Sequence, residues 1–371
     1  GVKQPHLYPP TPPPQDNIAK KKEYFTEINY LRGLAIFFIV WCHCILMMRY
    51  VGQADWTTTW WILDHVRATV VDGSSSLFVF ISGFLFYHIF YKRGFEYRSF
   101  LKGKFLKVFL PWLLITTFFA AYRLSRGQGS VWDSNFVYYG CYYYWSFWYV
   151  PFIMVTFLCS CFYIKFIEAN QKNQVIVLVI STVFSMCLGR HNGNAFLSAL
   201  FWNSFYLFGI FVGLHYQKMK SWDIGTKQCI LAGTCLTLAA LASSGDWHYI
   251  KDWGTYHLKL NERIEWMVLG KMLLCVSLVG IFYYFKDHGW QWLKWTLNLL
   301  AKYSFSIFFL HQFALLWIER HPHRAFLAQL NFYGLHTTAF ILGVVMCVLC
   351  IAVAAPVKKL TGKYSRMVIG A

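Results

Sequence analysis

Long apolar segments recur along this 371-residue chain, and they constrain its fold more than any other feature. A helix that crosses the hydrocarbon core of a bilayer needs about 20 mostly apolar residues. The sequence predicts an all-α polytopic membrane protein with about ten transmembrane helices. The ten expected spans, of which 174–189 is the shortest, are 31–48, 69–91, 105–122, 148–166, 174–189, 198–216, 226–243, 264–285, 299–318 and 335–355.

The few charged residues support this interpretation. They make up only 13% of the chain, about half of the share in soluble domains, and cannot cover a surface that faces water. The net charge of +18 comes from Lys and Arg in short runs between apolar segments, which is typical of cytoplasmic loops and not of a nucleic-acid-binding face. We therefore expect a multi-pass protein of the plasma or inner membrane, with the N- and C-termini cytoplasmic and no nucleic-acid partner.

Three regions are expected along the chain. Residues 1–22 contain six of the ten prolines and three consecutive lysines, which predicts a disordered cytoplasmic lead-in. Residues 23–357 would form the transmembrane domain, and residues 358–371 a basic cytoplasmic tail.

The eleven cysteines predict neither a disulfide framework nor a metal site. All except Cys141 lie in or beside apolar segments, where a free cysteine behaves as a small hydrophobic residue. In Cys42-His43-Cys44, neighbouring side chains of a helix point about 100° apart, so the three cannot converge on one ion.

The first span carries two ionisable residues, Arg32 and His43. Such residues are costly in a bilayer unless they are paired or line a wet cavity, so they are candidates for function. Eleven residues turn a helix through about 1100°, which places the two side chains on one face about 16 Å apart along the axis. A cation that can bind phosphate is thus aligned with a titratable imidazole. Snorkelling of Arg32 and a structural hydrogen bond of His43 are the alternative explanations.

The second span contains small residues and begins near an acid. Ser82 and Gly83 are candidates for cofactor binding, and Gly83 allows close backbone approach. Close packing against another helix through small residues explains them almost equally well. Asp72, at the outer end, could orient His43 or simply face water.

Two further groups are candidates. Lys104 and Lys107 lie one helical turn apart and would form an anion clamp at the inner membrane face, unless they only set the topology. His311 lies in the ninth span, where it needs a partner, and its role could be structural or catalytic.

Aromatic residues crowd two expected outer loops, 132–149 and 246–257. An interfacial aromatic belt is the favoured explanation. The functional alternative is a platform on which sugar rings stack, with Trp145, Trp148 and Tyr149 as substrate-binding candidates.

Five of these motifs, in order, resemble the acyltransferase-3 family of integral membrane O-acyltransferases. They are Arg-x10-His from Arg32 to His43, Phe-Val-Phe-Ile-Ser-Gly-Phe-Leu at 78–85, the basic pair before Pro111, Trp148-Tyr149, and Tyr-Ser-Phe-Ser-Ile-Phe-Phe-Leu-His at 303–311. Family members often have Arg where this chain has Lys104 and Lys107, which keeps the charge but loses bidentate phosphate contacts. An Asp common in the family is here Ser76, and the Glu that many members place after the Trp motif is absent.

The resemblance implies transfer of an acyl group, usually acetyl, from cytoplasmic acyl-CoA to a hydroxyl of an extracytoplasmic or lipid-linked glycan. It implies that Arg32, Lys104 and Lys107 bind the phosphates of the co-substrate, acetyl-CoA or another acyl-CoA, and that His43 is the essential catalytic residue. Asp72 or His311 would position the imidazole. Two other hypotheses remain: a transporter or flippase that uses the histidines as a proton relay, and a membrane sensor with a degenerate site.

Overall fold

The computed structural model describes residues 25–51, 69–188, 194–220, 264–319 and 332–370, together with 227, 230, 231 and 233–235. Every regular element within these residues is a helix, which confirms the predicted fold class. The expected lead-in 1–22, the aromatic loop 246–257 and nearly all of the expected span 226–243 lie outside the described residues.

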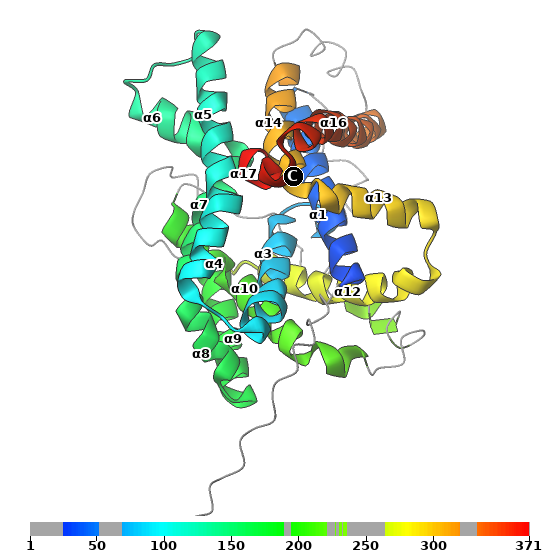
Figure 1. The fold of residues 1–371 in the computed structure, drawn as a ribbon. Helices are drawn as coiled ribbons and strands as arrows, with labels where there is room; N and C mark the ends of the chain where they lie inside the picture. The colour runs from blue at the N-terminus through cyan, green and yellow to red at the C-terminus, as the bar shows by residue number, and fades with distance from the viewer. Residues whose placement is uncertain are drawn as a thin grey trace, which may run out of the picture.

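The helices follow one another with short connections in the described ranges (Figure 1). The longer ones are α1 (Thr26–Val51), α3 (Ser75–Leu85), α4 (Tyr97–Lys104), α5 (Leu110–Ser125), α7 (Tyr149–Leu158), α8 (Ser160–Glu168), α9 (Gln171–Leu188), α10 (Ala195–Lys220), α12 (Met267–His288), α13 (Gln291–Lys302), α14 (Ser304–Glu319) and α16 (Phe332–Thr361). The shorter ones are η1 (Phe86–Phe90), η2 (Tyr91–Arg93), η3 (Phe105–Phe109), α6 (Ser134–Val137), η4 (Tyr138–Tyr142), η5 (Trp145–Trp148), η6 (Gly362–Tyr364) and α17 (Ser365–Val368).

The described part contains seven helical stretches that are long and apolar enough to cross a membrane, or nine if two bent helix pairs each count as one span. These nine correspond to nine of the ten expected segments, including the short one at 174–189, which is α9. Nearly all of the tenth, 226–243, falls outside the described residues. The cytoplasmic placement of the termini stays a prediction.

Both bent pairs change direction within a single expected span. α7 and α8 meet at Cys159 with a bend of 55°, and α13 meets α14 at Tyr303 with a bend of 77°. Figure 1 shows α13 running almost across the direction of α14. The helix that carries His311 therefore starts at Ser304. The preceding helix, α13, crosses the N-terminal half of α1.

Glycines allow two close helix crossings. A Cβ atom on Gly83 of α3 would lie 2.0 Å from the carbonyl oxygen of Tyr206, and one on Gly209 of α10 would lie 2.0 Å from that of Phe80. The two helices therefore interlock through reciprocal glycines, which is the packing role that the sequence left open for Gly83. At Gly33, α1 approaches α13 in the same way, with 2.1 Å to the carbonyl oxygen of Leu297.

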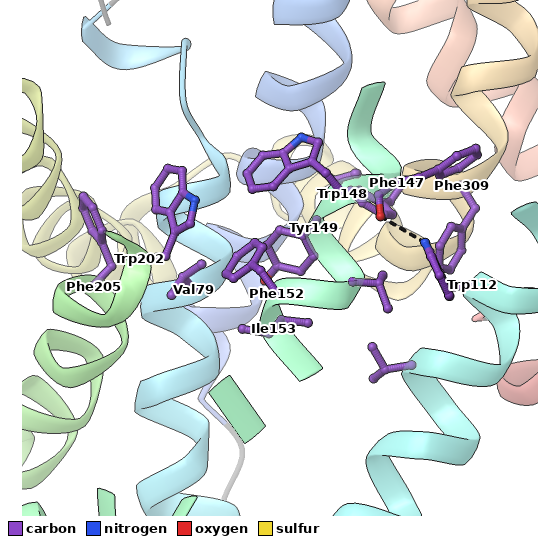
Figure 2. Packing of buried hydrophobic residues seen from close by; sticks show 14 of the residues in the cluster. Val79, Trp112, Phe147, Trp148, Tyr149, Phe152, Ile153, Trp202, Phe205 and Phe309 are labelled. Carbon is purple, nitrogen blue, oxygen red and sulfur yellow. Dashed lines mark hydrogen bonds between the residues drawn. The ribbon is translucent and has the colours of Figure 1, made fainter. Parts of the chain in front are cut away.

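The core beside these crossings is aromatic (Figure 2). Trp148 stacks on Phe152 with ring centroids 5.3 Å apart, and Trp202 of α10 stacks on both rings at 6.2 Å. Trp112 of α5 donates its indole N–H to the carbonyl oxygen of Phe147 at 3.0 Å, which satisfies a buried polar atom and ties η5 to α5.

The C-terminal segment folds back onto the helix bundle. A turn at Gly362, with φ of 51°, follows α16 and reverses the chain into η6 and α17. The hydroxyl of Ser306 on α14 donates to the carbonyl oxygen of Ile369 at 2.9 Å. Figure 1 shows α17 between α5 and the pair α14 and α16. The residues expected as a basic tail are thus ordered and packed against three helices.

Enlarging Gly83 tests the interlocked crossing. We expect Gly83→Val to lower the free energy of unfolding by about 1–3 kcal/mol or more, because the added atoms meet backbone and cannot be accommodated by rotating a side chain. The measurement is the midpoint of thermal unfolding of the detergent-solubilised protein. Gly280→Ala in α12 is the matched control, since its Cβ would meet no atom within 4 Å. Equal midpoints for the two variants would contradict the crossing.

Candidate active site

His43 of α1 and His311 of α14 meet inside the bundle. Nδ1 of His43 lies 2.8 Å from Nε2 of His311, and the two ring planes differ by only 10°. Atoms this close cannot belong to rings stacked face to face, because stacked atoms stay about 3.5 Å apart. The imidazoles therefore lie edge to edge in nearly one plane, as an in-plane N–H···N hydrogen bond requires.

The surroundings of His311 fix the tautomers of both rings. Nδ1 of His311 lies 2.8 Å from the carbonyl oxygen of Ile307, an acceptor only, so this nitrogen carries the proton. In the neutral ring, Nε2 of His311 then carries the single lone pair and accepts a hydrogen bond from Nδ1–H of His43, while the side-chain amide of Gln312 lies 2.8 Å from the same nitrogen. His43 consequently holds its lone pair on Nε2, the arrangement of a general base or nucleophile.

Arg32 lies in a polar chain that joins α1 to α13. Its guanidinium donates to the side-chain oxygen of Asn29 at 2.8 Å, and the Asn29 amide donates to that of Asn298 at 2.6 Å. The chain lies next to the Gly33 crossing, where the two helices are closest. These hydrogen bonds hold the side chain of Arg32 on the helix face that it shares with His43. The helix rise places the two residues about 16 Å apart along α1.

Ser82, Tyr149 and Phe308 connect the second span to the histidine pair. The hydroxyl of Tyr149 is hydrogen-bonded to Ser82. The ring of Tyr149 packs edge-on against Phe308 at 5.6 Å, and Phe308 lies 6.5 Å from the ring of His311. A chain of contacts thus joins Ser82 to His311 through Tyr149 and Phe308.

Two of the aromatic residues expected to bind substrate lie in the core. Trp148 and Tyr149 are both 7% exposed and are covered by other side chains of the protein (Figure 2). Their packing stabilises the wall of the site, and a sugar-stacking role for them stays a prediction. The side chain of Trp145 lies outside the described part of the chain. Asp72 is half-buried in the turn before α3, and its role in orienting His43 also stays a prediction.

Lys104 and Lys107 are close together but have different surroundings. The wide turn of η3, a π-helix, begins between them. The ammonium of Lys104 faces the rings of Phe157, Phe90 and Phe100 at 4.4, 4.7 and 5.4 Å, whereas Lys107 is exposed. Cation–π contacts of this kind hold an ammonium in place without neutralising it, so its charge remains available to an anion.

The structure adds three cations that sequence reasoning did not place in the site. Arg366 of α17 acts electrostatically on both Lys104 and Lys358. Lys302 and Lys358 lie over the ring of Tyr303 at 5.4 and 5.5 Å. Their proximity depends on the bend at Tyr303 and on the fold-back of α17, and neither leaves a local signal in the sequence. We call Lys104, Lys107, Lys302, Lys358 and Arg366 the basic cluster.

The structure thus combines a histidine pair inside a helical membrane protein with a separate group of cations. A membrane transferase that uses an anionic donor needs both of these parts.

The family model for the acyltransferase-3 domain, described as an acyltransferase domain, matches residues 25–355. The chain belongs to this family and is a multi-pass membrane acyltransferase. Comparison with curated proteins and with solved structures returned no significant match. In the part of the chain that the structure describes, no group of three or more His, Cys, Asp or Glu side chains is arranged to hold a metal.

Substitution of His311 tests its role as the residue that positions His43. We expect His311→Met, which fills the space but offers His43 only a weak acceptor in its thioether, to lower kcat for acyl transfer by at least about tenfold. His311→Gln keeps a polar atom near the position of Nε2 and should restore part of the loss. Both variants should bind the acyl donor with the affinity of the wild type. Equal kcat values for the Met and Gln variants would show that His311 only fills space.

Proposed function

We propose that this acyltransferase moves an acyl group, usually acetyl, from cytoplasmic acyl-CoA to a hydroxyl of an extracytoplasmic or lipid-linked glycan, with His43 as the general base. The observation that carries the proposal is the hydrogen bond between His43 and His311, which leaves the lone pair of His43 on Nε2. A histidine held in one tautomer is the arrangement found where an imidazole has to remove a proton from a hydroxyl.

The reaction follows from this tautomer. Nε2 of His43 takes the proton from the acceptor hydroxyl as its oxygen attacks the thioester carbonyl. The new C–O bond forms, the C–S bond breaks, and the proton passes from His43 to the departing thiolate of CoA. While His43 is protonated, Nε2 of His311 keeps accepting the hydrogen bond from Nδ1–H and stabilises the imidazolium. Direct attack by Nε2 uses the same lone pair: a C–N bond to His43 would form, the C–S bond would break, and CoA would leave as a thiolate. The acceptor oxygen would then attack the acyl group, the C–N bond would break, and the hydroxyl proton would pass to the thiolate.

The positions of the cations along the two helices support an acyl-CoA donor. Arg32 is about 16 Å from His43 along α1, and Ser304, next to Lys302 and Tyr303, is about 10 Å from His311 along α14. The pantetheine arm of CoA has a comparable reach. Phosphates bound at the basic cluster or at Arg32 would therefore allow the thioester to approach the imidazole pair from one end of the two helices.

The test compares His43→Ala with the wild type in membrane vesicles supplied with radiolabelled acetyl-CoA. We expect acyl transfer to glycan to fall at least about a hundredfold, because the general base is lost. Stabilisation of the solubilised protein by acetyl-CoA in a thermal-shift assay should persist. Mass spectrometry of glycans from cells with and without the protein identifies the acyl group and the acceptor.

His288→Ala is a matched control for this experiment. His288 is exposed at the end of α12, where its ring stacks on Tyr284, and lies outside the site. A His43→Ala protein that acylates glycan like the control would exclude the proposed role. If the wild type showed neither stabilisation by acetyl-CoA nor acyl transfer, the acyl-CoA reaction would be wrong and a proton-coupled transporter would be favoured.

A further inference from the structure

The basic cluster is assembled from four separate parts of the chain. Lys104 and Lys107 come from α4 and η3, Lys302 from the end of α13, Lys358 from α16, and Arg366 from α17. The fold-back of α17 brings Arg366 between the other two pairs, because α17 packs against η3 and α5 on one side and α16 on the other. The bond from Ser306 to Ile369 fixes α17 in this position.

The charges of this cluster form two overlapping groups. The ammonium of Lys104 is repelled by Arg366 and Lys107, and that of Lys358 by Lys302 and Arg366. Arg366 belongs to both groups. All of the charged residues that influence Lys104 and Lys358 appreciably, among the described residues, are cations. Like charges gathered in this way destabilise the protein unless an anion lies among them.

The orientation of the cations favours an anion from solution. Lys107, Lys302 and Arg366 are exposed, while Lys104 and Lys358 are held against aromatic rings. The exposed cations can be reached by a ligand from outside, and the two ammonium groups held by aromatic rings add fixed positive charge for its phosphate oxygens. A guanidinium adds the planar, two-point contact to phosphate that the lysines at 104 and 107 cannot make.

We infer that the basic cluster binds two separate phosphate groups of one donor molecule, and that Arg366 contacts both. For the acyl-CoA donor of the proposed function, on which this inference rests, the two groups are the pyrophosphate and the 3′-phosphate. One group would bind at Lys104 and Lys107, and the other at Lys302 and Lys358. The C-terminal helix α17 is then part of the donor site and determines specificity for the 3′-phosphorylated form of the donor.

The experiment measures kcat and KM with acetyl-CoA and with 3′-dephospho-acetyl-CoA, using the full chain in nanodiscs of neutral phosphatidylcholine. We expect Arg366→Gln to raise KM for acetyl-CoA by about ten- to a hundredfold, the effect of losing a hydrogen bond to a charged group. Its kcat should stay within about twofold, because Arg366 would contact the phosphates of the donor and has no part in the proton transfer by His43. The wild type should prefer acetyl-CoA over the dephospho form. This preference should be lost in one of two paired variants, Lys104→Gln/Lys107→Gln or Lys302→Gln/Lys358→Gln.

Lys359→Gln and Lys363→Gln are matched controls, because each removes one exposed cation from the same segment outside the cluster. Arg366→Lys keeps the charge and should give an intermediate KM, and elution from a sizing column shows that the variants fold. The inference would be wrong if Arg366→Gln had the same KM for acetyl-CoA as the controls, or if neither paired variant altered the preference for acetyl-CoA. Acyl transfer by the wild type would still support the proposed function in either case. If Arg366→Gln changed KM only in nanodiscs that contain anionic lipid, the cluster would bind lipid headgroups, and this result would also contradict the inference. Absence of any acetyl-CoA turnover in the wild type would instead contradict the proposed function.

Discussion

Within a bilayer, no water is present to satisfy buried polar groups, and each must find its partner in the protein. This constraint accounts for the central position of α1, which meets α3, α12, α13, α14 and α16. Near one end of α1, Arg32 donates to Asn29, and Asn29 donates to Asn298. Farther along the helix, His43 is hydrogen-bonded to His311, and His311 to the carbonyl oxygen of Ile307. The bonds that make a polar helix tolerable in lipid also orient the groups that can carry out chemistry.

The candidate catalytic residues lie on two helices, α1 and α14, and each histidine follows a cation along the chain. α1 has a cation at Arg32 and a histidine eleven residues later, and α14 follows Lys302 and carries its histidine nine residues later. The histidines meet while the cations lie at the same end of both helices, so α1 and α14 run in the same direction. Such an arrangement separates the binding of a charged donor from the transfer of its acyl group. The glycine crossing of α3 with α10 and the aromatic core beside Tyr149 keep this separation rigid.

Much of the fold and part of the site could be predicted from the sequence, because hydropathy and helical spacing are local properties. They located nine spans in the described residues and aligned Arg32 with His43. They also identified His311 as a histidine that needs a partner. The same reasoning could not choose between packing and cofactor binding for Gly83, since both require a small residue, and only the neighbouring carbonyl of Tyr206 favours packing. For Trp148, an aromatic residue at the membrane surface and one in an aromatic core have the same sequence pattern. Arg366 was missed because its neighbours depend on a bend sixty residues earlier.

The fold-back at Gly362 also bears on biosynthesis. Residues 362–369 follow every span of the described chain, and they reach their place only after α14 and α16 are in the membrane, since they pack on both. If α17 completes the donor site, that site can form only after α14 and α16 have been inserted, and a partly inserted molecule cannot yet bind the donor.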